Sequence, residues 1–405
     1  MVLKPTWARS GSSLLLGVEL NYVEMGQARY LSKVERTTGE AFILTYTKEG
    51  YLYQVMDHSG RTVTYQMQGA KLTGVCTPKG NWYRYGYSST GKLESVQNPR
   101  EIVTVENVYD EQLRTVYQKF LDGGSMSYEY DDENRSVTLT ERNGSKVTYV
   151  HDEKFRDVKH IYSDGEERFE YNKLNQKTLV VDKLGNRTQY GYDPKGNLTR
   201  IINPLGVKTE LKYDNNNQPV YLALNGERKV KNTYDDAGNL TETIDALGNR
   251  YAVTYKKQGQ PEIIIQPDGS RIRLGYDARG NINTLTDAVG NISFYRYDAL
   301  NRVTETVDGN GNVTKYAYDA EGNITEVING KGDIRSYTYD AVGNVTSMTD
   351  AAGNRTEYRY TLTGQLSKIT DPLRNEVEYT YDERDQLIQI RQSESSGVFG
   401  MDADL

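Results

Sequence analysis

A tyrosine stands at every 21st position over much of the chain. The series comprises Tyr171, Tyr192, Tyr213, Tyr234, Tyr255, Tyr276, Tyr297, Tyr318, Tyr339, Tyr360 and Tyr381. Aspartate follows the tyrosine at eight of these eleven places, so the recurring unit is a Tyr-Asp pair. A fixed period of this length indicates a repeat architecture, in which each unit packs its apolar side chains against its neighbours. We therefore expect one long array rather than several independent domains.

The array extends upstream with looser spacing. His151 takes the place of a tyrosine in "TYVHDEKF", and earlier members of the series are Tyr46, Tyr65, Tyr87, Tyr109 and Tyr130. About 17 repeats then occupy residues 41–392. We expect residues 1–40 to form a degenerate repeat or cap and residues 393–405 to form a C-terminal tail.

Each repeat carries two turn signals. The first follows the tyrosine, as in "YDAEGN" (318–323), and the second lies about half a repeat further on, as in "DAAGN" (350–354). Aspartate can accept hydrogen bonds from the backbone amides ahead of it, and glycine takes the positive φ that hairpin loops need. Strands of about six residues between such turns predict an all-β antiparallel meander of about 34 strands. An open twisted sheet rarely exceeds about ten strands. We therefore expect the ribbon to spiral into a curved wall or hollow shell and to cover its strand edges with the next coil.

The strand that precedes each Tyr-Asp pair alternates in character. In "RTEYRY" (355–360), Thr356, Tyr358 and Tyr360 fall on one face, and the charged residues between them fall on the other. We expect one face of the sheet to carry tyrosines that stack from repeat to repeat and the other face to be charged and solvated. Rows of tyrosine could also stack on sugars, and the alternation alone does not separate the two hypotheses.

Composition limits the classes of function. The net charge is −7 and the pI about 5.3, with basic residues scattered, which argues against a nucleic-acid surface. Cys76 is the only cysteine, so neither an internal disulfide nor a thiolate metal site is expected. No apolar run is long enough for a membrane span, and Leu14–Leu16 is too short for a signal peptide. We expect synthesis in the cytoplasm without a cleaved signal, which leaves export or a cell-surface location as part of a secretion-system effector open.

Several stretches imitate catalytic motifs. "GYSSTGKL" (86–93) fits the spacing of a phosphate-binding loop, but Leu93 stands where Ser or Thr would hold magnesium, so a hairpin turn is favoured. Turn residues are also favoured over calcium loops, because the EF-hand and β-roll spacings are absent. His58, His151 and His160 lack metal-ligand spacing. Carboxylate pairs such as Asp131-Asp132 and Asp235-Asp236 are not expected to converge, because adjacent strand residues point to opposite faces, and solvated turn charge is favoured for them. We predict no catalytic, cofactor-binding or metal-binding residues, and no cofactor.

The repeat resembles the YD repeat of the Rhs family. "YDDAGNLTETIDALGNRYAVTY" (234–255) and "YDAVGNVTSMTDAAGNRTEYRY" (339–360) carry the pattern in register, and the resemblance covers most of the chain. Similar proteins include bacterial Rhs polymorphic toxins, wall-associated YD proteins, the B and C components of insecticidal toxin complexes, and teneurins. The resemblance implies a β-shell that encloses a C-terminal toxin or serves as an adhesion scaffold. The Asp-Pro-x-Gly-Leu type motif of toxin-bearing members is missing, because "TDPLRN" (370–375) lies at an ordinary second turn.

The leading hypothesis is therefore a non-enzymatic scaffold, a shell segment of an Rhs/YD-repeat toxin system that encapsulates a toxin or another cargo. Its expected partners are the toxin domain or other shell segments, in the same or a neighbouring chain. The alternative is a cell-surface adhesion or carbohydrate-binding protein with glycan partners. An enzyme within the repeats has the least support. Because an isolated ribbon leaves sheet edges open, we also expect self-association.

Overall fold

The computed structural model describes residues 18–26, 28–36, 38–256, 259–382 and 385–393, and the backbone of residues 401–404. Parts of the predicted N-terminal cap and C-terminal tail, residues 1–17, 394–400 and 405, lie outside this description. The chain forms two compact units. Unit 1 combines Met1–Ser125 with Tyr295–Leu405, and unit 2 is Met126–Phe294.

The described residues form 37 β-strands and no helix. In the N-terminal part of unit 1 these are β1 (Val18–Met25), β2 (Ala28–Arg36), β3 (Ala41–Tyr46), β4 (Leu52–Asp57), β5 (Thr62–Gln68), β6 (Lys71–Cys76), β7 (Trp82–Tyr87), β8 (Leu93–Gln97), β9 (Val103–Tyr109) and β10 (Thr115–Phe120). Unit 2, with the two strands that cross its limits, contains β11 (Ser125–Asp131), β12 (Ser136–Thr140), β13 (Lys146–His151), β14 (Asp157–Tyr162), β15 (Gly165–Tyr171), β16 (Lys177–Val181), β17 (Arg187–Tyr192), β18 (Leu198–Ile202), β19 (Lys208–Tyr213), β20 (Pro219–Leu224), β21 (Glu227–Tyr234), β22 (Leu240–Asp245), β23 (Arg250–Tyr255), β24 (Pro261–Ile265), β25 (Arg271–Tyr276), β26 (Ile282–Thr286) and β27 (Ile292–Tyr297). The C-terminal part of unit 1 contains β28 (Val303–Val307), β29 (Val313–Tyr318), β30 (Ile324–Ile328), β31 (Ile334–Tyr339), β32 (Val345–Thr349), β33 (Arg355–Tyr360), β34 (Leu366–Thr370), β35 (Glu376–Tyr381), β36 (Leu387–Ser393) and β37 (Met401–Asp404).

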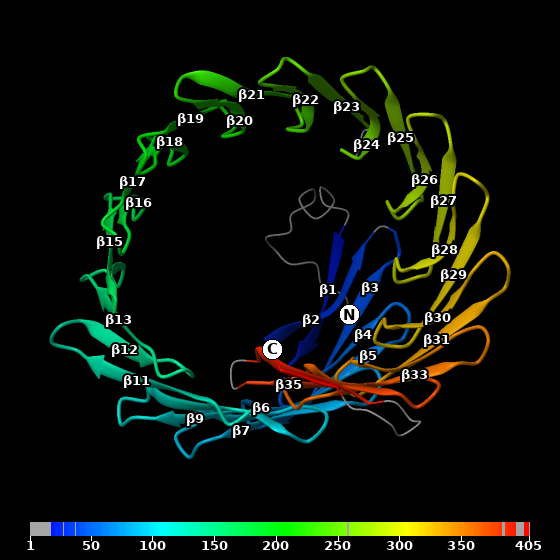
Figure 1. The fold of residues 1–405 in the computed structure, drawn as a ribbon, viewed down its shortest axis with the longest axis horizontal. Helices are drawn as coiled ribbons and strands as arrows, with labels where there is room; N and C mark the ends of the chain where they lie inside the picture. Colours follow the sequence, from blue (N-terminus) through cyan, green and yellow to red (C-terminus); the bar gives the residue numbers. More distant parts are fainter. Residues whose placement is uncertain are drawn as a thin grey trace. The chain divides into compact units, whose positions relative to one another are not determined.

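The strands follow one another as an antiparallel meander, which confirms the predicted fold class. Within each unit, strands pair with their neighbours in sequence, as β31 does with β32 and β32 with β33 (Figure 1). The described part of the chain holds 34 strands from β3 to β36, which agrees with the number expected from the turn signals.

The sheet is a single layer. Among the described residues, strand-to-strand contacts join sequence neighbours only, and few residues are buried on either face. Few apolar residues in the described part of the chain are buried, and they are Ala41, Val147, Leu179 and Ala223. The accessible surface is 25796 Å² for a mass of 46.0 kDa. A compact protein of this mass would expose about 16,000 Å². The chain is therefore stabilised along the ribbon, repeat on repeat, rather than by one central core.

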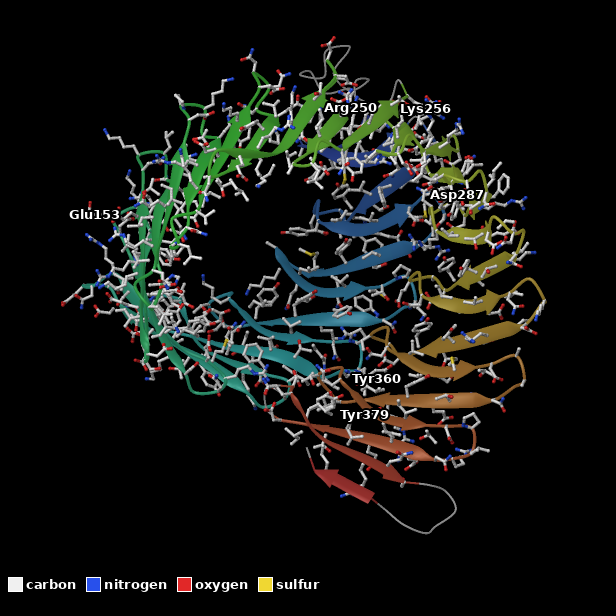
Figure 2. All side chains as sticks on the ribbon, turned by 45° about the horizontal axis from the view of Figure 1, so that its top comes forward. Glu153, Arg250, Lys256, Asp287, Tyr360 and Tyr379 are labelled. Carbon is white, nitrogen blue, oxygen red and sulfur yellow. The ribbon has the colours of Figure 1, made fainter. Side chains whose placement is uncertain are left out.

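The two faces differ as the alternation predicts. On β33, Thr356, Tyr358 and Tyr360 are half-buried, whereas Arg355 and Arg359 are exposed. Figure 2 shows side chains leaving both sides of the sheet, with Tyr360 and Tyr379 marked in unit 1 and Glu153 and Arg250 marked in unit 2. Cross-strand ion pairs such as Lys368 Nζ–Glu376 Oε2 (2.5 Å) lie on the charged face.

The hairpin turns alternate between the two edges of the ribbon. We name the loops that follow the periodic tyrosine A turns and the loops half a repeat later B turns. A turns 298–302, 319–323, 340–344 and 361–365 therefore lie along one edge, the A edge, and B turns such as 308–312 and 329–333 lie along the other, the B edge. The candidate functional residues are found on these two edges.

Candidate functional site

The aspartate of the repeat closes each turn. In A turn 319–323, Oδ1 of Asp319 accepts the amides of Glu321 and Asn323, each at 2.9 Å. Its Oδ2 accepts Nδ2 of Asn323 at 2.9 Å, and Gly322 takes a φ of +96°. The same three bonds recur in the described turns that begin at Asp182, Asp193, Asp235, Asp245, Asp277, Asp287, Asp308, Asp340 and Asp350. The Asp-x-x-Gly-Asn motif is thus a capped hairpin loop, as predicted.

Arginine replaces the asparagine in four turns and strengthens the same closure. In turn 152–156, Nε of Arg156 donates to Oδ2 of Asp152 at 2.8 Å, and the guanidinium lies 4.9 Å from the ring of Tyr171. The hydrogen bond from Arg156 holds the pKa of Asp152 at about 2. Asp57, Asp110 and Asp298 pair in the same way with Arg61, Arg114 and Arg302.

The periodic tyrosine has a hydrogen-bonding role that the sequence did not predict. The hydroxyl of Tyr339 donates to the carbonyl oxygen of Ile324, 15 residues earlier, at 2.6 Å. Other tyrosines of the described ranges also donate to a carbonyl 14–16 residues back, among them Tyr46, Tyr87, Tyr109, Tyr171, Tyr192, Tyr213, Tyr234, Tyr255, Tyr276, Tyr318 and Tyr381. A β-bulge lies at this tyrosine, between Thr338 and Tyr339, and a bulge re-aims the side chain it carries. Burial of the ring raises the pKa of Tyr339. The phenol therefore joins each repeat to the one before it.

This bond replaces the stacking that was expected between tyrosines one repeat apart. Equivalent tyrosines are two strands apart, about 9.6 Å, which exceeds the range of ring stacking. Tyr30 and Tyr46 lie on the adjacent strands β2 and β3, and their ring centroids are 5.0 Å apart.

The two ends of the array meet in unit 1. B turns 36–40, 57–61, 77–81 and 98–102 contact A turns 298–302, 319–323, 340–344 and 361–365, so residues 240–262 positions apart touch. We call this row of contacts the seam. In Figure 1, β4 and β5 (blue) lie alongside β30 and β31 (yellow to orange). A coiling ribbon was expected to contact itself, and the seam is such a contact. It is formed by hairpin turns rather than by strand edges, because the strands already pair with their neighbours within the sheet.

Lys79 is the centre of the seam. Its Nζ lies 2.9 Å from Oδ2 of Asp319 and 3.9 Å from Oε2 of Glu321. Glu321 also accepts from Thr77 Oγ1 at 2.5 Å and from Asn81 Nδ2 at 3.3 Å. Burial alone would raise the pKa of Asp319, but the bonds from Asn323, Lys79 and the turn amides outweigh it and lower the pKa to about 2.

Further bonds extend the seam on either side of Lys79. Arg61 donates from Nη1 to the carbonyl of Ala320 at 3.2 Å, and His58 Nε2 lies 2.5 Å from the carbonyl oxygen of Ala299. Arg100 donates from Nη2 to the carbonyl of Leu362 at 3.0 Å. Asn301 donates from Nδ2 to Oε1 of Glu40 at 2.7 Å. Cations lie mainly on the B turns and carboxylates on the A turns, so the two edges are complementary in charge.

The sequence held one signal for the seam. Lys79 and Arg100 are 21 residues apart at the third position of consecutive B turns, where later repeats carry uncharged or acidic residues as well as lysine. Nothing in the sequence indicated the turns that they bind.

The other sequence candidates lie in ordinary parts of the repeat. Residues 86–93 form the end of β7, A turn 88–92 and the start of β8, which confirms a hairpin at the phosphate-loop look-alike. His151 stacks on Phe155, and His160 lies between Tyr149 and Phe169 with centroid distances of 4.6 and 4.8 Å. No group of three or more His, Cys, Asp or Glu in the described ranges could hold a metal ion. The same part of the chain contains no helix long and apolar enough to cross a membrane.

The carboxylate pairs lie at turns rather than within strands. Asp235 caps A turn 235–239 through the amides of Ala237 and Asn239, and Asp236 is exposed beside it. Asp131 ends β11 and accepts the amide of Asn134 at 3.0 Å. Their interpretation as solvated turn charge is therefore confirmed, although Asp131 is the last residue of β11 and the Asp235-Asp236 pair lies wholly in the loop.

Two family comparisons match this repeat. The Teneurin YD-shell family matches residues 168–296, and the RHS Repeat family matches residues 297–334, 339–376 and 360–396. The chain belongs to the RHS/YD-repeat family. Together the matches cover more than half of its length. No curated protein sequence matches it.

Solved toxin-complex structures resemble the fold of this YD-repeat chain. The crystal structure of TcdB2-TccC3-TEV matches 93% of the chain with a TM-score of 0.52 and 14% identity, and the match covers 23% of that chain. The Photorhabdus luminescens Tc holotoxin pore matches 97% with a TM-score of 0.40 and 13% identity, over 27% of that chain. The protein thus spans about a quarter of the length of these relatives, and the first match supports a shared fold.

Proposed function

We propose that this chain is a structural segment of an RHS/YD toxin system, a non-enzymatic β-wall that encloses a C-terminal toxin or another cargo. The observation that carries the proposal is the single-layer sheet. It exposes 25796 Å², compared with about 16,000 Å² for a compact protein of its mass. A one-layer sheet leaves both faces available, one to solvent and one to whatever it surrounds.

The repeat chemistry supports a mechanical role. The aspartates close turns, and the periodic tyrosines hold the preceding repeat through their hydroxyl groups. The groups that define the repeat are therefore engaged in holding the sheet together, and enclosure needs no reacting group. The toxin-complex structures that share the fold contain chains several times longer, which agrees with this chain being one segment of a larger wall.

Limited proteolysis tests enclosure. The gene product that contains this chain is digested with any sequence that precedes or follows it, and the fragments are mapped. An enclosed segment resists cleavage in the intact product and becomes sensitive when the seam is opened by Lys79→Glu. Equal cleavage in both products would contradict enclosure. Enclosure would also be contradicted if the gene product neither contains a cargo segment nor copurifies with a separate cargo protein. In that case a glycan array tests the adhesion alternative.

A further inference from the structure

The seam contains a groove between two B turns. Turns 36–40 and 57–61 border a groove of about 440 Å³, and Leu300 and Asn301 of A turn 298–302 form part of its wall. Asn301 fixes the contact through its 2.7 Å bond to Oε1 of Glu40. Leu300 is half-buried there.

A second groove of the same construction lies on the B edge of β30–β33. Turns 329–333 and 350–354 border it, and its volume is also about 440 Å³. Seven of its lining residues stand 293 positions after seven that line the seam groove, among them Val327 for Val34, Asp333 for Glu40 and Ala351 for His58. A following groove of about 270 Å³, between turns 350–354 and 371–375, corresponds to the site where the seam receives turn 319–323. Among the described contacts, no A turn occupies either groove.

One A turn of unit 2 matches the turn that lines the seam groove. Turn 172–176, "NKLNQ", has Leu174 and Asn175 where turn 298–302, "DALNR", has Leu300 and Asn301. Asn175 and Asn301 take the same left-handed backbone, with φ of +62° and +61°. Leu174 is 65% exposed, whereas its counterpart in the seam is half-buried. A turn shaped for such a groove therefore stands uncovered.

We propose that the groove between turns 329–333 and 350–354 binds turn 172–176 of a second copy of this chain. Leu174 enters the groove beside Val327 and Ala351, as Leu300 does in the seam. Asn175 donates its amide to Oδ1 of Asp333. In the described contacts this oxygen has no donor, since Asn329 binds Oδ2 at 2.9 Å.

The contact is weaker than the seam. Ala351 lines the groove where the seam groove has His58, and no residue of this groove replaces Arg61 of the seam groove. Two copies also lack the covalent connection that makes the seam contact intramolecular. We therefore expect reversible association that increases with concentration. The two contacting surfaces differ, so each copy can bind one copy through its groove and another through its turn 172–176.

Sedimentation equilibrium of the full chain over a concentration series tests the proposal. The wild type is expected to show a mass that rises with concentration. Leu174→Asp places a charge in the groove and removes the buried leucine side chain, so it should weaken association at least about tenfold. Leu184→Asp is the matched control, because Leu184 is 87% exposed at the same position of B turn 182–186 and should leave association unchanged.

Cross-linking identifies the two surfaces independently of affinity. In a Cys76→Ser background, Leu174→Cys chains mixed with Ala351→Cys chains should form a disulfide-linked heterodimer faster than either chain links to itself. A mass independent of concentration overturns the proposal. So does equal weakening by Leu174→Asp and Leu184→Asp, or association that neither variant affects, which would place the contact at the open strand edges.

Discussion

Replacing Lys79 with methionine removes the charge at the centre of the seam and keeps most of the side-chain volume. The ammonium lies 2.9 Å from Asp319 and 3.9 Å from Glu321. The substitution leaves both carboxylates without their cation in a half-buried contact.

The size of the effect follows from the exposure of the three side chains. Lys79 retains 29% of its accessible surface, Asp319 13% and Glu321 19%. Exposed ion pairs contribute about 0.2–1 kcal/mol, whereas breaking a buried pair costs about 3–5 kcal/mol. Because the pair is half-buried and Lys79 has two acceptors, Lys79→Met should lower the free energy that holds the seam closed by about 1–2 kcal/mol. The population of the open seam then increases roughly tenfold.

Hydrogen exchange measured by mass spectrometry reports the effect locally. Peptides that contain turns 77–81 and 319–323 should exchange about tenfold faster in Lys79→Met, and peptides of unit 2 should not change. Lys331→Met is the matched control, because Lys331 occupies the third position of B turn 329–333, is exposed and lies outside the seam. Equal exchange in the two variants at turn 319–323 would refute the assignment of Lys79 to the seam.

Three further predictions concern the repeat unit. Tyr339→Phe removes the hydrogen bond from the hydroxyl to Ile324 and should lower the free energy of unfolding, measured in urea, by about 1 kcal/mol. The control Tyr337→Phe should change it by less than about 0.5 kcal/mol. Similar losses in both variants would show that the Tyr339 hydroxyl bond does not stabilise the fold. Asp319 has a folded pKa of about 2 against an ordinary 3.8, so its stabilisation is complete above pH 3.8 and is lost as the pH falls to 2. Asp319→Asn should flatten stability in that window, and an unchanged acid profile would count against the assigned ion pairs. Phe155 is 84% exposed at a φ of +59°, so Phe155→Gly should raise the melting temperature by relieving about 1 kcal/mol of backbone strain. A lower melting temperature would contradict the assignment of strain to this position.

The turns and strands could be predicted from the sequence because their determinants are local. The aspartate, glycine and asparagine that close turn 319–323 lie within five residues, and the same letters recur in register. The two faces of β33 could be predicted as well, because the alternation of side chains along a strand is also a local property of the sequence. Family resemblance added the expectation of a shell.

The role of the tyrosines could be predicted only in part. Alternation placed Tyr339 on the correct face, but the bulge between Thr338 and Tyr339 directs its hydroxyl to Ile324. Repetition along a sequence suggests contact between equivalent residues, yet two strands separate them in a meander. The partner is therefore a backbone carbonyl, which leaves no trace in a residue pattern.

The seam could not be predicted because it depends on accumulated geometry. The strands β5–β27, 23 in number, separate turn 57–61 from turn 298–302. Adjacent strands rotate by about 20–25°, so an uncertainty of 1° per strand grows to about 23° over this distance and changes which turns meet. Lys79 and Asp319 belong to turns of different sequence, and neither indicates the other.

The most direct test of the central claim is the distance in solution between the two rows of turns. Spin labels at Ser59→Cys and Ala299→Cys, in a Cys76→Ser background, mark neighbouring turns of the seam, where His58 and Ala299 are hydrogen-bonded at 2.5 Å. Pulsed electron resonance should then give one population at the shortest distances that the method resolves. An uncoiled ribbon would hold the same turns about 110 Å apart, because strands are spaced by about 4.8 Å. A broad distribution at long distances would contradict the seam.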